Sequence, residues 1–444
     1  MRTNSRSGFS RFVVLWLGEW VSSIGSGLTA FVLGIYVFQQ TGTAASVSMV
    51  TLCAFLPSIL LSPISGVLAD RYDRRLLMIL GDLGSAAGLF CIVGVMLTGE
   101  LQVWHICVGM GISSVFGSLL DPAYKASITD LLGEQQYARA SGMVQLAAAS
   151  KYLLSPVLAG QLLMVLDIQW ILILDIGTFA VTIFAIAAVR RQNTRPAQPG
   201  EVTASPSAPG LVQPADPNRS AIGELMAGWR MVRSETGVLL LTGMLAAVTF
   251  NVGFVQTLFT PLLLPLTDAD TLGTVLSISA TGLLAGSLIV GILHIERYLL
   301  RFLSLGLVMA GLFLMFIGAS VNVVIITAAA FLFFSSLPFV NTSAEVLIRR
   351  TIPNEAQGRA WGIIGILSQT GYVVAYAVAG PAADRWFNPL LEKGGKLAAS
   401  LGAWIGTGAG RGIGFMLILL GAAIVLIAWI VSRLGALREL ERRA

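Results

Sequence analysis

Ionisable side chains inside long apolar runs are the residues of this sequence whose types and spacing point to chemistry. Glu19 lies in the apolar run 12–38, and Ser22 and Ser26 follow it at helical spacing, so the three make one polar stripe. A charged group at the centre of a bilayer costs at least ~2.5–3.5 kcal/mol, and such groups face a protein interior or a water-filled cavity. A carboxyl group in a partly dry cavity holds a proton more readily than one in water, which makes Glu19 the first candidate for a proton carrier. The alternative is a glutamate fixed by a hydrogen bond or by a buried cation.

The fourth apolar run carries a similar polar stripe. Ser118 and Asp121 lie on one face, and Lys125 follows four residues after Asp121. Asp121 is the second candidate for a proton carrier, although Lys125 is close enough to hold it permanently charged. In the tenth apolar run, Asn341 and Glu345 are also one helical turn apart.

A lysine in the fifth apolar run is the most unusual of these charges. Lys151 lies about 18 Å past Arg139 in a helix, which puts it near mid-membrane. A lysine at that depth does not readily reach the interface. We expect it to bind an acidic substrate or to neutralise Glu19. Asp82 and Asp175 lie in the third and sixth runs, where we expect structural pairing.

Aromatic and amide side chains complete the candidate pocket. Gln256 lies on a polar face of the seventh run, and Tyr372 and Tyr376 are one turn apart in the eleventh. Tyrosine rings can stack on a flat or apolar substrate while their hydroxyl groups bind polar atoms. The candidate pocket residues are therefore Ser22, Ser26, Ser118, Lys151, Gln256, Asn341, Glu345, Tyr372 and Tyr376.

The composition identifies the elements that must position these residues. Of the 444 residues, 55% are hydrophobic and only 11% are charged, against roughly 25% in soluble domains. One membrane-spanning helix needs ~20 apolar residues. Hydropathy predicts twelve spans, six in each half of the chain. They cover 12–38, 45–69, 76–97, 102–125, 139–164, 168–189, 237–264, 271–294, 299–318, 322–348, 358–383 and 412–433.

The positions of the basic residues predict the orientation in the membrane. If the N-terminus is inside, the inner segments hold 23 of the 28 Lys and Arg residues and the outer loops hold four. Basic residues favour the cytoplasmic side, so both termini are expected there. The net charge of +5 then reflects membrane orientation and does not indicate a nucleic-acid partner.

A break in composition separates the two sets of spans. The segment 190–219 is rich in Pro, Ser, Ala and Gly and predicts a flexible cytoplasmic linker. An amphipathic segment, predicted to lie on the inner membrane surface, follows it; the alternative is an extension of the seventh span. The expected units are an N-terminal bundle (1–189), the linker with its amphipathic helix (190–236) and a C-terminal bundle (237–444).

The two halves also resemble each other. With a shift of 220 residues, Arg139-Ala140-x-Gly142 aligns with Arg359-Ala360-x-Gly362, just before the fifth and eleventh spans. Parallel repeats of this kind are a known plan of transporters.

The segment after the second span carries a family resemblance. Gly66-Val67-Leu68-Ala69-Asp70-Arg71-Tyr72-Asp73-Arg74-Arg75 resembles the loop signature of the major facilitator superfamily, with Asp73 where the family usually has Gly. The resemblance implies an all-α membrane protein of two six-helix pseudo-symmetric bundles, with the first, fourth, seventh and tenth spans around a central cavity. It also implies a conformational latch, for which we expect Gly66 to allow close helix approach and Asp70 to bind a neighbouring helix start. The latch candidates are Gly66, Asp70, Arg71, Arg74 and Arg75.

Further motifs narrow the resemblance. Asp121-Pro122-Ala123-Tyr124, Arg139-Ala140-Ser141-Gly142 and Gly228-Trp229-Arg230 are similar to the branch that contains macrolide-efflux and enterobactin-exporter proteins. This similarity implies proton-driven export of a small amphipathic molecule by alternating access. A siderophore or lysophospholipid exporter is the alternative within export, and an uptake symporter or a non-transporting sensor are the other classes considered.

Several kinds of function lack their signatures. Gly394-Gly395-Lys396-Leu397 does not complete a phosphate-binding loop, so ATP use is not supported. His105 and His294 lie in different spans, and the three cysteines lie in apolar runs, so neither a metal site nor a disulfide is expected. We therefore expect no enzyme activity and no cofactor. The expected partners are a small-molecule substrate, protons and the lipid bilayer of the inner (plasma) membrane, and the expected state is a monomer.

Overall fold

A computed structural model describes residues 2–193, 221–293 and 298–443, all of them in helices, turns and short loops. The predicted linker falls almost wholly outside these residues. Twelve helical segments are long and apolar enough to cross a membrane, and each coincides with a predicted span. The largest differences in length are at the first span, which covers Gly8–Thr41, and at the eleventh, which runs on to Leu391.

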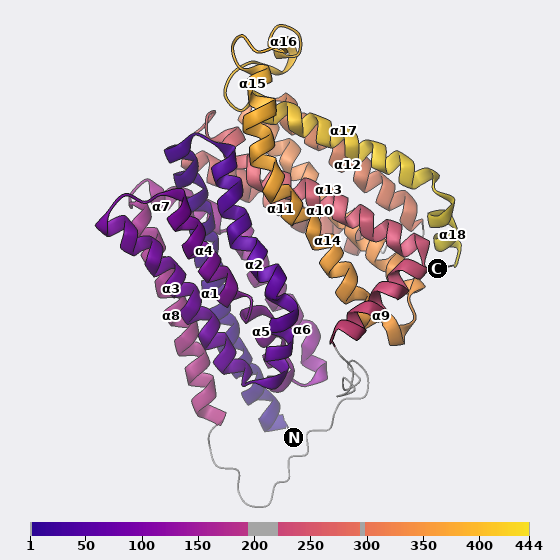
Figure 1. Cartoon of the computed structure of the whole chain (residues 1–444). Coiled ribbons are helices and arrows are strands. Elements are labelled where there is room, and N and C mark those ends of the chain that lie inside the picture. Colours follow the sequence, from indigo (N-terminus) through magenta and orange to yellow (C-terminus); the bar gives the residue numbers. More distant parts are fainter. Residues whose placement is uncertain (1, 194–220, 294–297, 444) are drawn as a thin grey trace, which may run out of the picture.

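The helices form two bundles that stand side by side in Figure 1. The first contains α1 (Arg2–Thr41), α2 (Ala44–Arg71), α3 (Arg74–Thr98), α4 (Val103–Gly117), α5 (Leu120–Leu131), α6 (Tyr137–Leu153), α7 (Ser155–Leu163) and α8 (Ile168–Asn193). The second contains α10 (Thr236–Leu263), α11 (Ala269–Leu293), α12 (Leu299–Ala319), α13 (Val323–Thr351), α14 (Asn354–Ala382) and α17 (Arg411–Arg433). The shorter elements are η1 (Glu134–Gln136), α9 (Ala221–Ser234), the π-helical turn η2 (Ala383–Phe387), α15 (Asn388–Leu391), α16 (Gly402–Ile405) and α18 (Gly435–Arg443).

Two spans are made of two helices each, and proline explains both breaks. Span four joins α4 to α5, and Pro122 in the first turn of α5 cannot donate a hydrogen bond to the preceding turn. Span five joins α6 to α7 at Leu154, where Pro156 occupies the same place in α7. The sequence analysis did not predict either break.

The ends of α1 and α3 follow from their local sequence. After Thr41 the chain turns at Gly42, whose φ of +64° lies in the left-handed region that suits glycine, and its N–H bonds the carbonyl of Phe38. Helix α3 begins after Asp73, whose carboxylate accepts the N–H of Arg75 at 3.0 Å. Asp73 therefore makes the turn between α2 and α3 in place of the glycine usual in the resembling family.

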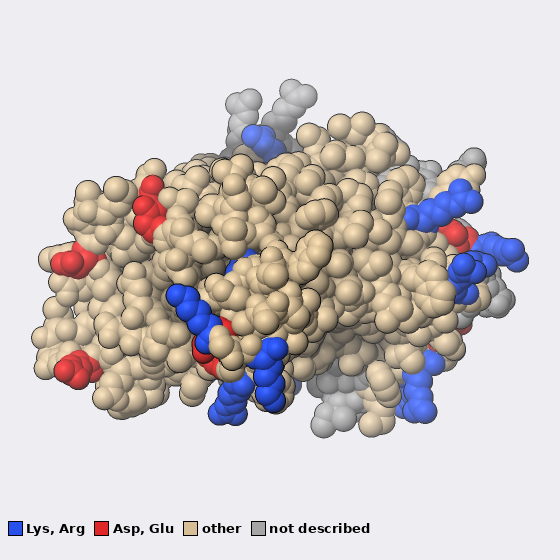
Figure 2. All heavy atoms as spheres, turned by 90° about the horizontal axis from the view of Figure 1, so that it is seen from above, with Lys and Arg blue, Asp and Glu red and all other residues tan. Residues whose placement is uncertain are grey.

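We call the end at which α1 begins and α17 ends the inner end, and the opposite end the outer end. The bundles touch at the outer end, where α2 packs on α14 and α7 packs on α11. A Cβ at Gly160 on α7 would lie 2.8 Å from the carbonyl oxygen of Ala269 on α11, so the backbones are in close contact there. Seen from this end, most of the surface is uncharged, and the basic side chains gather in a few places, some beside acidic ones (Figure 2).

Toward the inner end the bundles separate, and Figure 1 shows α5 and α6 diverging from α9 and α14. A Cβ at Gly66, Gly142 or Gly362 would meet no neighbouring helix within 4 Å. The structure is therefore closed at the outer end and open at the inner end.

Helix α9 coincides with the predicted amphipathic segment and is separate from the seventh span. A bend at Glu235 separates it from α10, so it is not an extension of the seventh span. It packs on α14, where Gly228 lies against the backbone carbonyl of Arg359, so one face contacts protein and not only lipid.

The outer connection between α14 and α17 rises above the bundles and carries α15 and α16 (Figure 1). Arg411, at the start of α17, is 3% exposed, and its guanidinium donates to the carbonyl groups of Ser320 and Ile405 at 3.0 Å each. This arginine ties the connection to the C-terminal bundle. Trp404 on α16, in this outer connection, is 89% exposed.

Candidate functional site

Glu19 lies in α1 with one carboxylate oxygen buried. Ser22, one turn further on, is also buried, and Glu19 itself is half-buried. Oε2 of Glu19 has no hydrogen-bond partner in the part of the chain that the structure describes. Glu19 interacts electrostatically with Asp121 on α5 and Lys151 on α6, so the three predicted charges are brought into one region.

Lys151 occupies the last turn of α6, next to the break at Leu154. It is half-buried, and among the described residues no carboxylate lies within ion-pair distance of it. Its electrostatic partners are Glu19 and Asp175. The structure thus places an unpaired cation near two acids, and the direct charge pair with Glu19 that we considered is not formed in this conformation.

Asp121 forms an ion pair with Lys125 across one turn of α5. Nζ of Lys125 lies 2.7 Å from Oδ2, and the two side chains are 72% and 63% exposed for Asp121 and Lys125. An exposed pair of this kind contributes at most about 1 kcal/mol to stability. Asp121 is therefore accessible from the open side, with its charge balanced by its neighbour.

The two acids assigned to structural pairing differ from each other. Asp175 on α8 accepts hydrogen bonds from the hydroxyl groups of Thr29 and Thr178, at 2.6 and 3.1 Å. Asp82 on α3 is fully buried, and neither of its oxygens has a hydrogen-bond partner among the described residues. The expected pairing is present at Asp175 and absent at Asp82.

The tyrosine pair is part of an aromatic contact between the two bundles. The ring of Phe55 on α2 lies edge-on to the rings of Tyr372 and Tyr376 on α14, with centroids 5.6 and 5.2 Å apart. The hydroxyl of Tyr376 donates to Oε1 of Gln256 on α10 at 2.5 Å. These four side chains therefore form a contact that joins α2 of the first bundle to α14 and α10 of the second. The sequence analysis missed Phe55, one of many apolar residues in the second span.

The remaining pocket candidates lie in different environments. Ser118 is 8% exposed and shares a hydrogen bond of 2.9 Å with Ser65 on α2, so it joins two helices within one bundle and does not line an open surface. Ser26 is half-buried on α1. Asn341 and Glu345 are exposed on α13.

The predicted latch residues make no hydrogen bond or ion pair with the other bundle in the described structure. Asp70 is exposed and has no hydrogen bond or ion pair in the described structure, and Arg71 is likewise exposed. Arg74 instead binds within its own bundle, donating to Asp130 at 2.6 Å and to the carbonyl of Ala126 at 2.9 Å. Arg75 is half-buried beside the cap of α3. A Cβ at Gly66 would meet nothing within 4 Å, so Gly66 does not bring helices together in this conformation.

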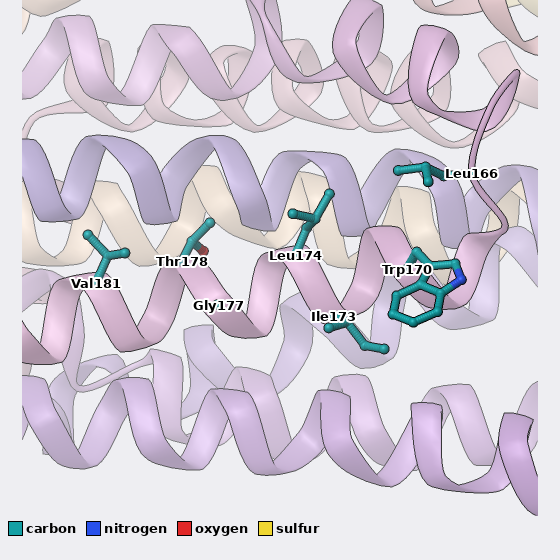
Figure 3. A pocket seen from close by; sticks show the side chains of 7 residues that line it. All are labelled: Leu166, Trp170, Ile173, Leu174, Gly177, Thr178 and Val181. Atoms are coloured by element: carbon teal, nitrogen blue, oxygen red, sulfur yellow. The ribbon is translucent and has the colours of Figure 1, made fainter.

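A shallow apolar groove of about 420 Å³ runs along α8, on which Asp175 also lies. It is lined by side chains of α8 and by Leu166, and Thr178 is its one polar side chain (Figure 3). Such a surface suits contact with lipid chains. Among the described residues, no group of three or more His, Cys, Asp or Glu is placed to hold a metal ion.

Twelve spans in two bundles, with ionisable groups inside the first and aromatic contacts between the two, define a polytopic membrane transport protein. The sequence matches the Major Facilitator Superfamily over residues 15–376, and the chain belongs to this family. It is a transporter and not an enzyme.

Relatives and solved structures agree with this assignment. The chain is 28% identical over 398 residues to macrolide efflux protein A of Streptococcus pyogenes, covering 85% of this chain and 91% of the relative. It is 22% identical over 406 residues to the multidrug efflux pump Tap of Mycolicibacterium fortuitum, with 86% and 91% covered. A bacterial homologue of the iron transporter ferroportin, solved in an inward-facing state, has the same fold, with a TM-score of 0.69, 12% identity and 98% and 99% of the chains covered.

Proposed function

We propose that this transporter exports a small amphipathic molecule, such as a drug, an antibiotic or a secondary metabolite, in exchange for protons. The observation that carries the proposal is Glu19, an acid within a span that has one buried oxygen without a partner. A buried carboxylate without a hydrogen bond is costly, and binding a proton removes its charge. The names of the efflux relatives support the direction of transport.

In this proposal Glu19 is the main proton carrier and Asp121 is secondary. Asp121 is already balanced by Lys125 at 2.7 Å, so a proton must compete with a bound cation there. Glu19 has no such direct partner. A proton that enters from the outer side would bind Glu19 while the transporter is open at the outer end. When the transporter opens at the inner end again, Glu19 would release the proton to the inner side.

Alternating access requires the bundles to rock between the observed arrangement and one that is open at the outer end. In that second arrangement the inner ends of α2 and α14 approach each other. Asp70, exposed at the end of α2, would then accept hydrogen bonds from the start of α14, with Arg71, Arg74 and Arg75 holding the loop. Gly66 would provide the close approach.

The substrate would bind below the contact of Phe55 with Tyr372 and Tyr376. These rings offer faces and edges to an apolar molecule, and Gln256 offers an amide. Asn341 and Glu345, which are exposed on α13, would add polar groups to this site.

Lys151 favours a second candidate function, the export of an acidic amphipathic cargo such as a siderophore or a lysophospholipid. The reason is its half-buried ammonium group, which lacks an ion-pair partner in the described structure. An acidic cargo would provide one. An uptake symporter is the less favoured alternative, because no observation on the described residues supports it.

The test uses inverted membrane vesicles, in which an imposed inside-acid pH gradient drives accumulation of a radiolabelled macrolide. Wild-type vesicles should accumulate the macrolide and release internal protons as they do so. Glu19→Gln should abolish gradient-driven accumulation while leaving downhill exchange. Glu100→Gln, which changes an exposed acid at the outer end, is the matched control and should behave as wild type. Unchanged pH-driven accumulation by Glu19→Gln would refute the carrier assignment.

We also propose that the protein acts as a monomer in the plasma membrane with both termini in the cytoplasm. The distribution of basic residues supports this orientation.

A further inference from the structure

The start of α2 is capped by an acid from the other bundle. The backbone N–H groups of Ala44 and Ala45 donate to Oδ1 and Oδ2 of Asp384, at 3.2 and 2.8 Å. The residue that precedes the helix, Thr43, makes no side-chain capping bond. The first N–H groups of a helix lack partners within it and carry a partial positive charge, so a carboxylate is a favourable cap. Here the cap comes from a residue 340 positions away.

Asp384 is held for this contact by its own surroundings. It lies in the π-helical turn η2 that follows α14, and Nδ2 of Asn388 lies 3.4 Å from its Oδ1. π-helical turns change the direction of side chains and are often found at functional positions. The carboxylate is thereby aimed across the interface at α2.

The same interface is closely packed around the cap. A side chain at Gly380 would collide with the backbone carbonyl of Ala44 and press on Ser48. The hydroxyl of Ser48 donates to the backbone carbonyl of Tyr376. Contact of α2 with α14 therefore closes the outer end through hydrogen bonds and direct backbone packing.

The sequence around Asp384 repeats that of the inner latch. Gly380-Pro381-Ala382-Ala383-Asp384-Arg385-Trp386 and Gly66-Val67-Leu68-Ala69-Asp70-Arg71-Tyr72 share G-x-x-A-D-R followed by an aromatic residue. Both segments end a helix of the same pair. Helices α2 and α14 run antiparallel, because Ala44 meets Gly380 while Phe55 meets Tyr372.

The two copies are in opposite states. At the outer end, Gly380 is in contact and Asp384 caps α2. At the inner end, Gly66 faces open space, Asp70 is without a partner in the described structure, and α14 begins after Pro353 with no side-chain cap.

We propose that Asp384 is the outer latch of this transporter and the counterpart of Asp70. Each aspartate ends one helix of the α2–α14 pair and caps the start of the other, and rocking exchanges one cap for the other. Asp384 is a positioning residue that stabilises the arrangement closed at the outer end. The proposal rests on the alternating access described above, although not on the identity of the substrate or the coupling ion.

The test measures the two ends of the molecule directly, in lipid nanodiscs without substrate or pH gradient. Spin labels are placed on cysteines in a background in which Cys53, Cys91 and Cys107 are replaced by alanine. The pair Gln40→Cys and Val324→Cys reports the outer end, and the pair Tyr72→Cys and Ser234→Cys reports the inner end. Pulsed electron paramagnetic resonance gives the distribution of distances between the two labels of each pair.

Asp384→Asn should lengthen the outer distance and shorten the inner one in a new population, increasing the ratio of outward-open to inward-open molecules by about fivefold or more. Asp268→Asn is the matched control. Asp268 also lies at the outer end and accepts the N–H of Thr271 at the start of α11, but it does so within its own bundle. Asp268→Asn should leave both distance distributions as they are in wild type. Adding Asp70→Asn to Asp384→Asn should shift the ratio back toward wild type.

Asp384→Asn keeps the shape of the side chain and one of its two acceptor oxygens. Gly380→Ala is a second variant, which keeps Asp384 and introduces a methyl group that collides with α2 at the same interface. The proposal is overturned if Asp384→Asn leaves both distributions unchanged or moves them no further than Asp268→Asn does. If the Asp384→Asn protein cannot be recovered folded, unchanged distributions in Gly380→Ala overturn it instead. Because these distances are measured without transport, a negative result leaves proton-driven export standing, and a failure of export leaves the latch standing.

Discussion

The hydroxyl group of Thr29 on α1 donates a hydrogen bond of 2.6 Å to Oδ2 of Asp175 on α8, inside the N-terminal bundle. Both residues are almost completely buried. Thr178 donates to the other carboxylate oxygen at 3.1 Å, so this acid is held by neutral donors on two helices. Asp175 therefore stabilises the packing of α1 on α8.

Asp175→Ala should lower the free energy of unfolding by about 1–3 kcal/mol, because it leaves the buried hydroxyl group of Thr29 without its acceptor, whereas Thr178 keeps the backbone carbonyl of residue 175. Thermal unfolding of the purified protein in detergent, followed by tryptophan fluorescence, measures the loss. Asp175→Asn retains an acceptor and should cost less. Equal losses in the two variants would show that the lost hydrogen bond from Thr29 is not the cause.

Asp82→Asn should have the opposite effect on stability. Asp82 is buried without a hydrogen-bond partner in the described structure, so removing its capacity for charge relieves a cost and breaks no contact. The expected change at pH 8 is between zero and about 1 kcal/mol of stabilisation, by the same unfolding measurement. A destabilisation as large as that of Asp175→Ala would contradict this account.

Tyr376→Phe removes the hydrogen bond to Gln256 and keeps the ring against Phe55. It should weaken binding of a transported macrolide by a few-fold, since one neutral hydrogen bond contributes about 1 kcal/mol. Phe55→Ala removes an edge-on contact with two rings and should weaken macrolide binding more than Tyr376→Phe does. Binding to the purified protein is measured by scintillation proximity with labelled macrolide. An unchanged affinity in both variants would place the substrate elsewhere.

Lys151→Ala should separate acidic from neutral cargo. If the ammonium group binds the cargo, uptake of an acidic amphipathic molecule into inverted vesicles falls at least about tenfold, while uptake of a neutral one is kept. Lys151→Arg preserves the charge and is the matched control. Equal losses for acidic and neutral molecules would assign Lys151 to the electrostatics of Glu19 and Asp175 instead.

The orientation in the membrane can be tested with single cysteines in the cysteine-free background. Lys396→Cys lies in the outer connection and Tyr72→Cys in the loop between α2 and α3, and both positions are exposed. A membrane-impermeant maleimide added to intact cells should label Lys396→Cys and leave Tyr72→Cys unlabelled until the cells are opened. The reverse pattern would invert the proposed topology.

Hydropathy was sufficient to predict the twelve spans, because the bilayer requires each span to be apolar over its whole length. Proline marks the breaks near Pro122 and Pro156, but it could not single them out, because Pro57, Pro261 and Pro338 lie inside unbroken helices. The difference between Asp82 and Asp175 could not be predicted from the sequence, because it depends on whether hydroxyl groups of other residues face the acid in the folded structure.

Contacts between the bundles were the least predictable part of the site. Phe55 and Asp384 contact residues more than 300 positions away in the sequence. The signal for Asp384 was nevertheless present, as a second G-x-x-A-D-R segment. It is easily overlooked, because it ends a span at the outer face, where the family signature is not expected.

Trp404 stands at the tip of the outer connection, which Arg411 fastens to the C-terminal bundle. In the proposed orientation, a nanobody raised against this projection would bind from outside the cell and move with that bundle alone. It would add rigid mass for imaging while leaving the movement between the bundles free. The same attachment makes the projection a suitable place for a fluorescent reporter of C-terminal bundle rotation.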